Sequence, residues 1–254
     1  LPATRHLHWF FNDGPGGRLQ MILVGYIGAW WAPDKIVAET AWRHIRSEGG
    51  GISLDFGVHF FDQIRHVAGE IRGVTAQTAI IEPHRKTIGP DGTVAMSLDC
   101  DADDTFFAQF DTERNVVGNL MASWAGHGGA TVVADGSVFY GSQARVTGTR
   151  ATFDSAPSAD LGEQYASRAS ADRQARDFPL GLTDSFALAQ LDWLEAVRQR
   201  RQPETSGREG LHDLAAAFAI VESATLGRRV ELAEVLDGRA SEYQRSINQR
   251  HGFA

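Results

Sequence analysis

The sequence predicts an α+β fold: an open, predominantly antiparallel β-sheet with helices packed on one face and the other face available for oligomerisation. Five strand-like runs follow one another between residues 71 and 148, and short clusters of Gly, Asp and Asn separate them. Because strands joined by short turns pair in antiparallel, these runs predict neighbouring strands of one sheet. One helical pattern precedes the strands and two follow them.

The elements before the sheet are predicted from turn residues and from side-chain type. They are, in order, a turn cluster (Asn12–Gly17), one or two helical turns (18–24), a strand interrupted at Pro33 (27–40) and a helix (about 51–68). Gly25 and Gly69 are placed to end the two helices. The strand is assigned because residues 27–40 are rich in aromatic and β-branched side chains.

The remaining elements are predicted from a change of period after residue 70. The strands are Ile71–Glu82, Thr105–Phe110, Val116–Trp124, Thr131–Tyr140 and Ala144–Gly148. Residues 154–181 lack a clear period and are expected to form a long loop. The first closing helix carries an apolar stripe of Phe186, Leu188, Leu191, Leu194 and Val197. The second begins at Ser206, an expected N-cap with Glu209 placed for a capping box, and residues 230–232 suggest a short edge strand.

The bulk composition excludes several classes of function. The formal net charge of −8 disfavours nucleic acid or an anionic membrane as a partner. Cys100 is the only cysteine, so an intrachain disulfide is impossible and a reducing compartment fits. The longest apolar run is far shorter than the roughly 20 residues that span a bilayer. A cytoplasmic protein is therefore expected.

The helix after residue 51 carries the most informative residue pattern. Asp55, His59, Asp62 and His66 stand at i, i+4, i+7 and i+11, so they return to one side of the helix. This stripe can be the solvated face of an amphipathic helix. It can also do acid–base work, in which Asp55 orients His59 and His59 exchanges a proton with a substrate hydroxyl. A metal site is a third reading, although the two histidines lie about 10 Å apart along the helix.

The three glycines Gly49–Gly51 before this helix also allow two readings. They can form a flexible connector, or they can let a ligand approach free backbone N–H groups. The sequence has no G-x-G-x-x-G motif, so it shows no dinucleotide-binding half. Trp42 and Arg43 precede the glycines, and an arginine there could pair with phosphate or carboxylate. His127 is expected in an exposed loop near the end of a strand.

Several of these segments together resemble the C-terminal domain of the Gfo/Idh/MocA oxidoreductases. The matching segments, in order, are Gly25–Gly28, Trp42-Arg43, Gly49–Gly51 with Asp55, Gly57, His59 and Asp62, Asp103–Phe110, Val116–Trp124, Ser206–Glu209, Glu222–Ala224 and Gly227–Val230. The resemblance runs from about residue 18 to about residue 232.

This resemblance implies an oxidoreductase that moves a hydride between NAD or NADP and a carbohydrate, polyol or related carbinol. It implies that His59 is the proton-transfer residue, that Asp55 is its partner, and that Trp42 and Arg43 lie near the cofactor. Asp62, His127 and Tyr165 are the expected substrate contacts. It further implies residues 1–24 as the crossover from a missing Rossmann domain, 25–235 as the substrate and oligomerisation domain, and 236–254 as a tail.

One departure from the family pattern leaves room for other functions. The family's Glu-Lys-Pro motif has no counterpart here, because Lys35 and Lys86 stand in other contexts. The chain is therefore expected to be inactive alone. A non-catalytic binding and dimerisation module is the alternative, and a metal-dependent hydrolase using Asp55, His59 and Asp62 is a third.

The predicted sheet also predicts an assembly. A sheet covered on one face leaves an apolar surface, and monomers rarely expose large apolar patches. We therefore expect a homodimer or homotetramer that associates through the free sheet face. Trp30, Trp31 and Trp124 are the candidates for that face.

Overall fold

The computed structural model describes residues 2–28, 34–128 and 131–253. The strands are β1 (Leu19–Ile27), β2 (Ile71–Ala79), β3 (His84–Ile88), β4 (Val94–Asp99), β5 (Thr105–Thr112), β6 (Val117–Ser123), β7 (Thr131–Gly141), β8 (Ala144–Thr147), β9 (Arg150–Phe153), β10 (Ala159–Asp160) and β11 (Val230–Glu231). Within the described residues, nine of them form one sheet in the order β10-β9-β8-β7-β1-β6-β5-β2-β11. β3 and β4 form a separate hairpin.

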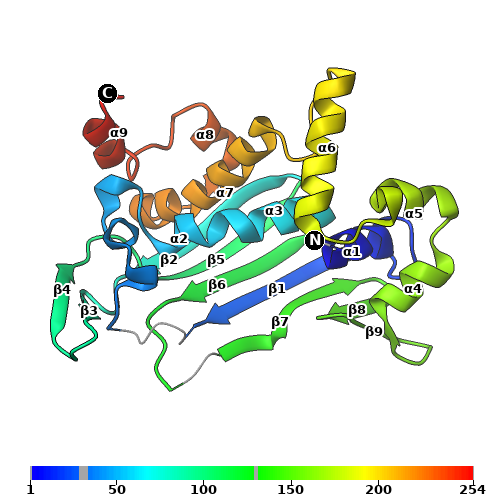
Figure 1. Cartoon of the computed structure of the whole chain (residues 1–254), viewed down its shortest axis with the longest axis horizontal. Coiled ribbons are helices and arrows are strands. Elements are labelled where there is room, and N and C mark those ends of the chain that lie inside the picture. Colours follow the sequence, from blue (N-terminus) through cyan, green and yellow to red (C-terminus); the bar gives the residue numbers. More distant parts are fainter. Residues whose placement is uncertain (1, 29–33, 129–130, 254) are drawn as a thin grey trace.

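The helices gather on one side of this sheet (Figure 1). They are α1 (Pro2–Asn12), α2 (Ile52–Asp55), α3 (Gly57–Ala68), α4 (Leu161–Arg168), α5 (Ala171–Asp177), α6 (Ser185–Gln199), α7 (Gly207–Leu226), α8 (Leu232–Leu236) and α9 (Arg245–His251), with short 3₁₀ turns at Val37–Glu39, Ala41–His44, Arg46–Glu48 and Pro179–Gly181. Helix α7 packs against β2 and against α3. The predicted α+β architecture is confirmed.

Alternation along the central strands explains why only one face is covered. In β5, Phe106, Ala108 and Phe110 are buried, whereas Phe107 between them is 51% exposed. Each inward phenylalanine contributes roughly 1.5–3 kcal/mol by leaving water. The outward side chains of neighbouring strands are in register, since Phe107 pairs with Met121 across the β5–β6 ladder. The sheet therefore has one apolar face under the helices and one mixed face in solvent.

β1 corrects two predictions for the N-terminal region. Residues 18–24 are expected to be helical, but 19–24 lie in a central strand that pairs parallel to β6 and antiparallel to β7. A short apolar run such as Met21–Val24 has no period that separates a buried strand from a helix, and its two neighbours decide the matter. The strand expected over 27–40 is also wrong for residues 34–40, the larger part of it that the structure describes. The chain forms 3₁₀ turns between residues 37 and 48 instead.

The N-terminal helix belongs to the same core as the sheet. Trp9 and Phe10 of α1 are buried in one apolar cluster with Ile22 of β1. The expected domain boundary after residue 24 thus falls inside β1.

Residues 154–181 are also not the expected loop, because they contain β10, α4 and α5. Asp160 caps α4 by accepting hydrogen bonds from the N–H groups of Gly162 and Glu163, and Ser170 caps α5. Both helices are short, so an apolar period hardly develops in them. The caps were the usable signal in the sequence.

The two closing helices are confirmed in position, but α7 is largely buried whereas the apolar stripe of α6 is largely exposed. α7 begins with the predicted Ser206 cap and ends at Gly227 in the left-handed region, and β11 is the predicted edge strand. In α6 only Leu188 of the predicted stripe is fully buried, and Phe186 is 78% exposed. No helix in the described residues is both long enough and apolar enough to cross a membrane.

The free sheet face is not formed by the expected tryptophans. Trp124 is fully buried, with its ring against His44 and Phe56, because it follows β6 at the point where the chain turns under α2. Its assignment to the oligomer face is wrong, and Trp30 and Trp31 lie outside the described residues. The exposed apolar side chains on this face are instead Met21, Phe107 and Val117.

Candidate active site

The glycine segment before α2 is a tightly packed turn. A Cβ at Gly50 would lie 2.4 Å from the Trp42 carbonyl oxygen, and one at Gly51 would lie 2.3 Å from Asp103 Oδ1. Gly51 also has φ +115°, which favours glycine. Their N–H groups are already used, since Gly50 donates to Ile45 and Gly51 to Arg43. The segment is therefore neither a flexible connector nor a cradle of free N–H groups.

This turn positions Trp42 and Arg43 beside Asp55. Arg43 Nε donates to Asp55 Oδ2 at 3.1 Å, and the Arg43 guanidinium lies 4.6 Å from the centre of the Trp42 ring. No hydrogen bond or ion pair joins Asp55 to His59 in the part of the chain that the structure describes. Instead, a charge-assisted bond to Arg43 takes the Asp55 carboxylate, and the helix is interrupted at Phe56 between Asp55 and His59. A role for Asp55 as the partner of His59 stays a prediction.

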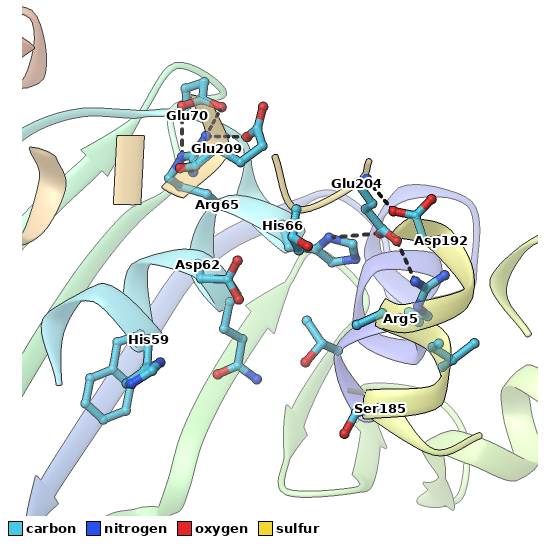
Figure 2. A pocket seen from close by; sticks show the side chains of 16 residues that line it. Arg5, His59, Asp62, Arg65, His66, Glu70, Ser185, Asp192, Glu204 and Glu209 are labelled. Atoms are coloured by element: carbon cyan, nitrogen blue, oxygen red, sulfur yellow. Dashed lines mark hydrogen bonds and ion pairs between the residues drawn. The ribbon is translucent and has the colours of Figure 1, made fainter. Parts of the chain in front are cut away.

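Most of the predicted helix stripe does meet at one cavity (Figure 2). The cavity has a volume of about 570 Å³ and lies between α1, α3, α6 and the segment that leads into α7. His59, Asp62 and His66 reach it from α3, Arg5 from α1, and Asp192 from α6. A cleft of this size with several convergent polar groups is the usual form of a small-molecule site.

His66 lies deeper in this cavity than His59, and burial sets its charge. Burial lowers the pKa of His66 below its ordinary value, and Arg5 lowers it further, while Glu204 and Asp62 act in the opposite direction. Its Nδ1 lies 3.9 Å from Glu204 Oε1. His66 is therefore neutral at pH 7, with one ring nitrogen able to donate and the other able to accept a hydrogen bond. Such a group suits a hydroxyl ligand.

Arg65 forms a rigid wall of the cavity. Its side chain is 5% exposed, and its guanidinium binds Glu70 Oε1 at 2.8 Å, Glu209 Oε2 at 2.8 Å and Asp213 Oδ1 at 2.5 Å. Burial disfavours the charged form of Arg65, but these hydrogen bonds outweigh it and raise the pKa of Arg65. Arg65 thus links α3 to α7 and holds the carboxylates of Glu70 and Glu209 in place.

Two other predicted substrate contacts do not lie in this cavity. His127 is exposed, and its Nε2 lies 3.1 Å from Glu82 Oε1. Tyr165 lies on α4 and not in a loop, is 3% exposed, and donates its hydroxyl hydrogen bond to Asp177 at 2.9 Å. Burial raises the pKa of Tyr165 above its ordinary value. Each side chain thus interacts with a residue outside the cavity, Glu82 for His127 and Asp177 for Tyr165.

The sequence reasoning missed other residues of the cavity. His66 was in the stripe but was not assigned to the site, and Arg5, Asp192 and Glu204 were not considered. Spacing could have added His66, since it follows Asp62 by four residues. The other three come from segments that meet α3 only after folding. Within the described residues, no group of three or more His, Cys, Asp or Glu side chains is arranged to hold a metal ion.

Asp103, which contacts the glycine turn, predicts how stability depends on pH. Its Oδ2 accepts from the N–H and hydroxyl of Ser53, whereas its Oδ1 is buried without a hydrogen-bond partner. Burial raises the pKa of Asp103 to about 6, above the value of about 3.9 in an unfolded chain. The folded state therefore holds this proton more tightly, and the stabilisation is lost as pH rises from about 4 through about 6.

We expect Asp103→Asn to remove this part of the pH dependence, because asparagine is neutral and can still accept from Ser53. The measurement is urea unfolding of both proteins at pH 4.5 and pH 7.5. The free energy of unfolding of wild type should fall more over this interval than that of the variant. Glu113→Gln, which changes an exposed carboxylate, is the control. Between the two pH values its free energy of unfolding should fall by as much as that of wild type. Equal falls for wild type and Asp103→Asn would contradict the assignment.

Comparison with known proteins gives one family match and several structural neighbours. Residues 16–232 match the family model GFO_IDH_MocA_C, described as the C-terminal alpha/beta domain of an oxidoreductase family. A D-xylose dehydrogenase of Paenarthrobacter nicotinovorans is 26% identical over 131 residues, which are 49% of this chain and 32% of that protein.

Among solved structures, levoglucosan dehydrogenase in complex with NADH and L-sorbose aligns with a TM-score of 0.67 and 20% identity over 92% of this chain and 64% of its own. An NAD-binding oxidoreductase from Klebsiella pneumoniae aligns with a TM-score of 0.69 and 15% identity over 91% of this chain and 64% of its own. The chain thus spans less than two thirds of the length of these proteins, and the structural likeness concerns the fold.

Proposed function

The chain belongs to the Gfo/Idh/MocA oxidoreductase family, and from this membership we propose that it is the substrate-binding half of an NAD(P)-dependent enzyme. The intact protein would transfer a hydride between the nicotinamide and a carbinol carbon of a sugar or polyol. The observation that carries this proposal is the 570 Å³ cavity, where His59, Asp62 and His66 converge. The relatives, a D-xylose dehydrogenase and a levoglucosan dehydrogenase, support the choice of substrate class.

In this proposal the residues of α3 divide the work of proton transfer and binding. His59 is exposed at the cavity and accepts the hydroxyl proton of the substrate during oxidation, or returns it during reduction. Asp62 and neutral His66, one and two turns further along the helix, form hydrogen bonds with neighbouring hydroxyls. The nicotinamide, when bound, supplies or takes up the hydride. His127 and Tyr165 have no part in this arrangement.

The cofactor would contact this chain through Trp42 and Arg43. Trp42 is 43% exposed and thus offers an aromatic surface, and the bond to Asp55 fixes the position of Arg43. Asp55 is accordingly proposed as a residue that positions Arg43. The glycine turn does not fit a pyrophosphate, because its N–H groups have partners. The dinucleotide would be bound mainly by a separate domain, for which the exposed apolar face of α6 offers a packing surface.

The proposed activity is tested by incubating the intact protein with NAD⁺ or NADP⁺ and a panel of neutral sugars and polyols. Reduction of the cofactor, followed by its absorbance, should appear with at least one of them. A protein that reduces neither cofactor with any member would favour the non-catalytic binding module.

We also propose that the free sheet face forms a homodimer. Phe107 and Val117 are 51% and 54% exposed on adjacent antiparallel strands, and their side chains lie on the same face of the sheet. A glutamate there would place a charge in the centre of the interface, where charged residues are depleted. Both Phe107→Glu and Val117→Glu should convert the dimer into a monomer in light scattering at micromolar concentration.

The matched control is Leu194→Glu on α6, which is 57% exposed but lies on a different surface. This variant should remain a dimer. If Leu194→Glu dissociates the dimer and the two strand variants do not, the interface lies on α6 and the sheet-face proposal is wrong.

A further inference from the structure

The charges around the candidate cavity are unequal. Five carboxylates line it, whereas the arginines among its lining residues are Arg5 and Arg65; the carboxylates are those of Asp62, Glu70, Asp192, Glu204 and Glu209. With neutral His66, this lining carries an excess of negative charge. A cavity lined by one sign of charge focuses the field and repels ligands of the same sign.

Neither arginine of the cavity is free to bind an anionic ligand. Arg65 is held by three carboxylates, as described above. Arg5 Nη2 binds Glu204 Oε2, and Arg5 Nη1 donates to the carbonyl oxygen of Asp177 at 3.0 Å. Figure 2 shows Glu204 between Arg5 and His66: it forms an ion pair with Arg5, and its Oε1 lies 3.9 Å from Nδ1 of the neutral His66. Glu204 thus occupies the position from which a ligand carboxylate could have paired with Arg5.

The remaining polar groups suit uncharged hydroxyls. Asp62 has no hydrogen bond or ion pair within the described residues, and its carboxylate points into the space between His59 and His66 (Figure 2). A carboxylate with free lone pairs accepts hydrogen bonds from hydroxyl groups and repels a second carboxylate or a phosphate. The Asp192 carboxylate already has hydrogen-bond partners within the protein, because it accepts from Arg201 Nη2 and from the N–H of Glu204.

From these contacts we propose that the cavity selects a neutral polyhydroxy substrate and rejects sugar acids and sugar phosphates, with Glu204 as the residue that determines this selection. The inference rests on the proposed function, since it concerns the substrate of the same site. It predicts a change that is specific to one variant: Glu204→Gln leaves Arg5 without its carboxylate partner and turns it into a cation available to an anionic sugar.

The test uses two ligands that differ at one carbon, methyl β-D-glucoside and methyl β-D-glucuronide. Their binding to the chain is followed by the imidazole NMR signals of His59 and His66. Wild type should bind the glucoside at least about tenfold more tightly than the glucuronide. Glu204→Gln should raise the affinity for the glucuronide at least about tenfold and leave that for the glucoside within about twofold; tenfold corresponds to about 1.4 kcal/mol.

Glu195→Gln is the matched control, because Glu195 lies on α6 outside the cavity and binds Arg198 and Gln199. It should bind both ligands as wild type does. If wild type or Glu195→Gln binds the glucuronide as tightly as the glucoside, or if Glu204→Gln changes neither affinity, the charge selection is wrong while the proposed function stands. If neither ligand shifts either histidine signal, the cavity does not take up a glycoside and the charge selection is overturned; the proposed function is then decided separately by the cofactor-reduction assay with the sugar and polyol panel.

Discussion

Replacing His59 by alanine is expected to lower kcat of the intact protein by roughly 10²-fold or more. His59 is exposed at the cavity that also contains Asp62 and His66, and it is the group proposed to exchange the substrate proton. Alanine removes that group but preserves the helix, because His59 makes no side-chain hydrogen bond in the described part of the chain. We expect the loss mainly in kcat, since Asp62 and His66 still bind the substrate hydroxyls.

The control for this experiment is His84→Ala in the β3–β4 hairpin. His84 is a strongly exposed histidine, and it pairs with Asp99 away from the cavity. Its replacement should leave kcat within about twofold of wild type. The pH profile adds a second readout: His59→Ala should lose a limb of the kcat/KM profile that His84→Ala retains. Near-normal turnover in His59→Ala would remove the catalytic assignment, whatever the substrate.

Replacing Arg85 by methionine is expected to lower the free energy of unfolding by about 3–5 kcal/mol, as is usual when one partner of a buried ion pair is removed. Arg85 is fully buried, and its Nη2 lies 3.0 Å from Asp104 Oδ2. Its Nη1 donates to the carbonyl oxygen of Lys35 at 3.0 Å. Methionine fills most of the space but leaves the Asp104 carboxylate buried without its counter-charge.

The same pair ties the β3–β4 hairpin to the main sheet. Asp104 also accepts from the N–H groups of Ile81 and Glu82, so it holds the middle of the connection between β2 and β3. Urea unfolding at pH 7 measures the effect. Arg72→Met is the matched control: Arg72 pairs with Asp111 at 3.2 Å on the surface and is 44% exposed, so its loss should cost at most about 1 kcal/mol. Equal losses for the two variants would contradict the importance of burial here.

Strands in which buried apolar and exposed side chains alternate were predictable from the sequence, and strands without that alternation were missed. β5 places a buried side chain at every second position, β2 and β6 do so over part of their length, and the sequence shows that period. The exposed β3–β4 hairpin has almost no buried side chain on β4, so no apolar alternation marks it. β1 was missed for a different reason: it lies between β6 and β7, and those pairings are made across about 100 residues of chain.

The candidate site was predictable only along one helix. His59, Asp62 and His66 share a face of α3 because helical geometry places residues three and four apart together. Asp55 satisfies the same rule, yet its carboxylate binds Arg43, which a glycine-dependent turn brings close. Local spacing therefore shows which side chains can meet, while the competing partner at each carboxylate comes from elsewhere in the chain.

By itself the sequence determined the α+β class, the helix with its row of Asp and His side chains, and the family. These depend on local periods and on short motifs, which are legible without tertiary contacts. Only the tertiary structure decided that Arg5, Asp192 and Glu204 complete the cavity, that Trp124 is buried, and that the glycines form a packed turn. The reason is physical: burial and ion pairing are set by the segment that packs against a side chain, and in each of these cases that segment is distant in sequence.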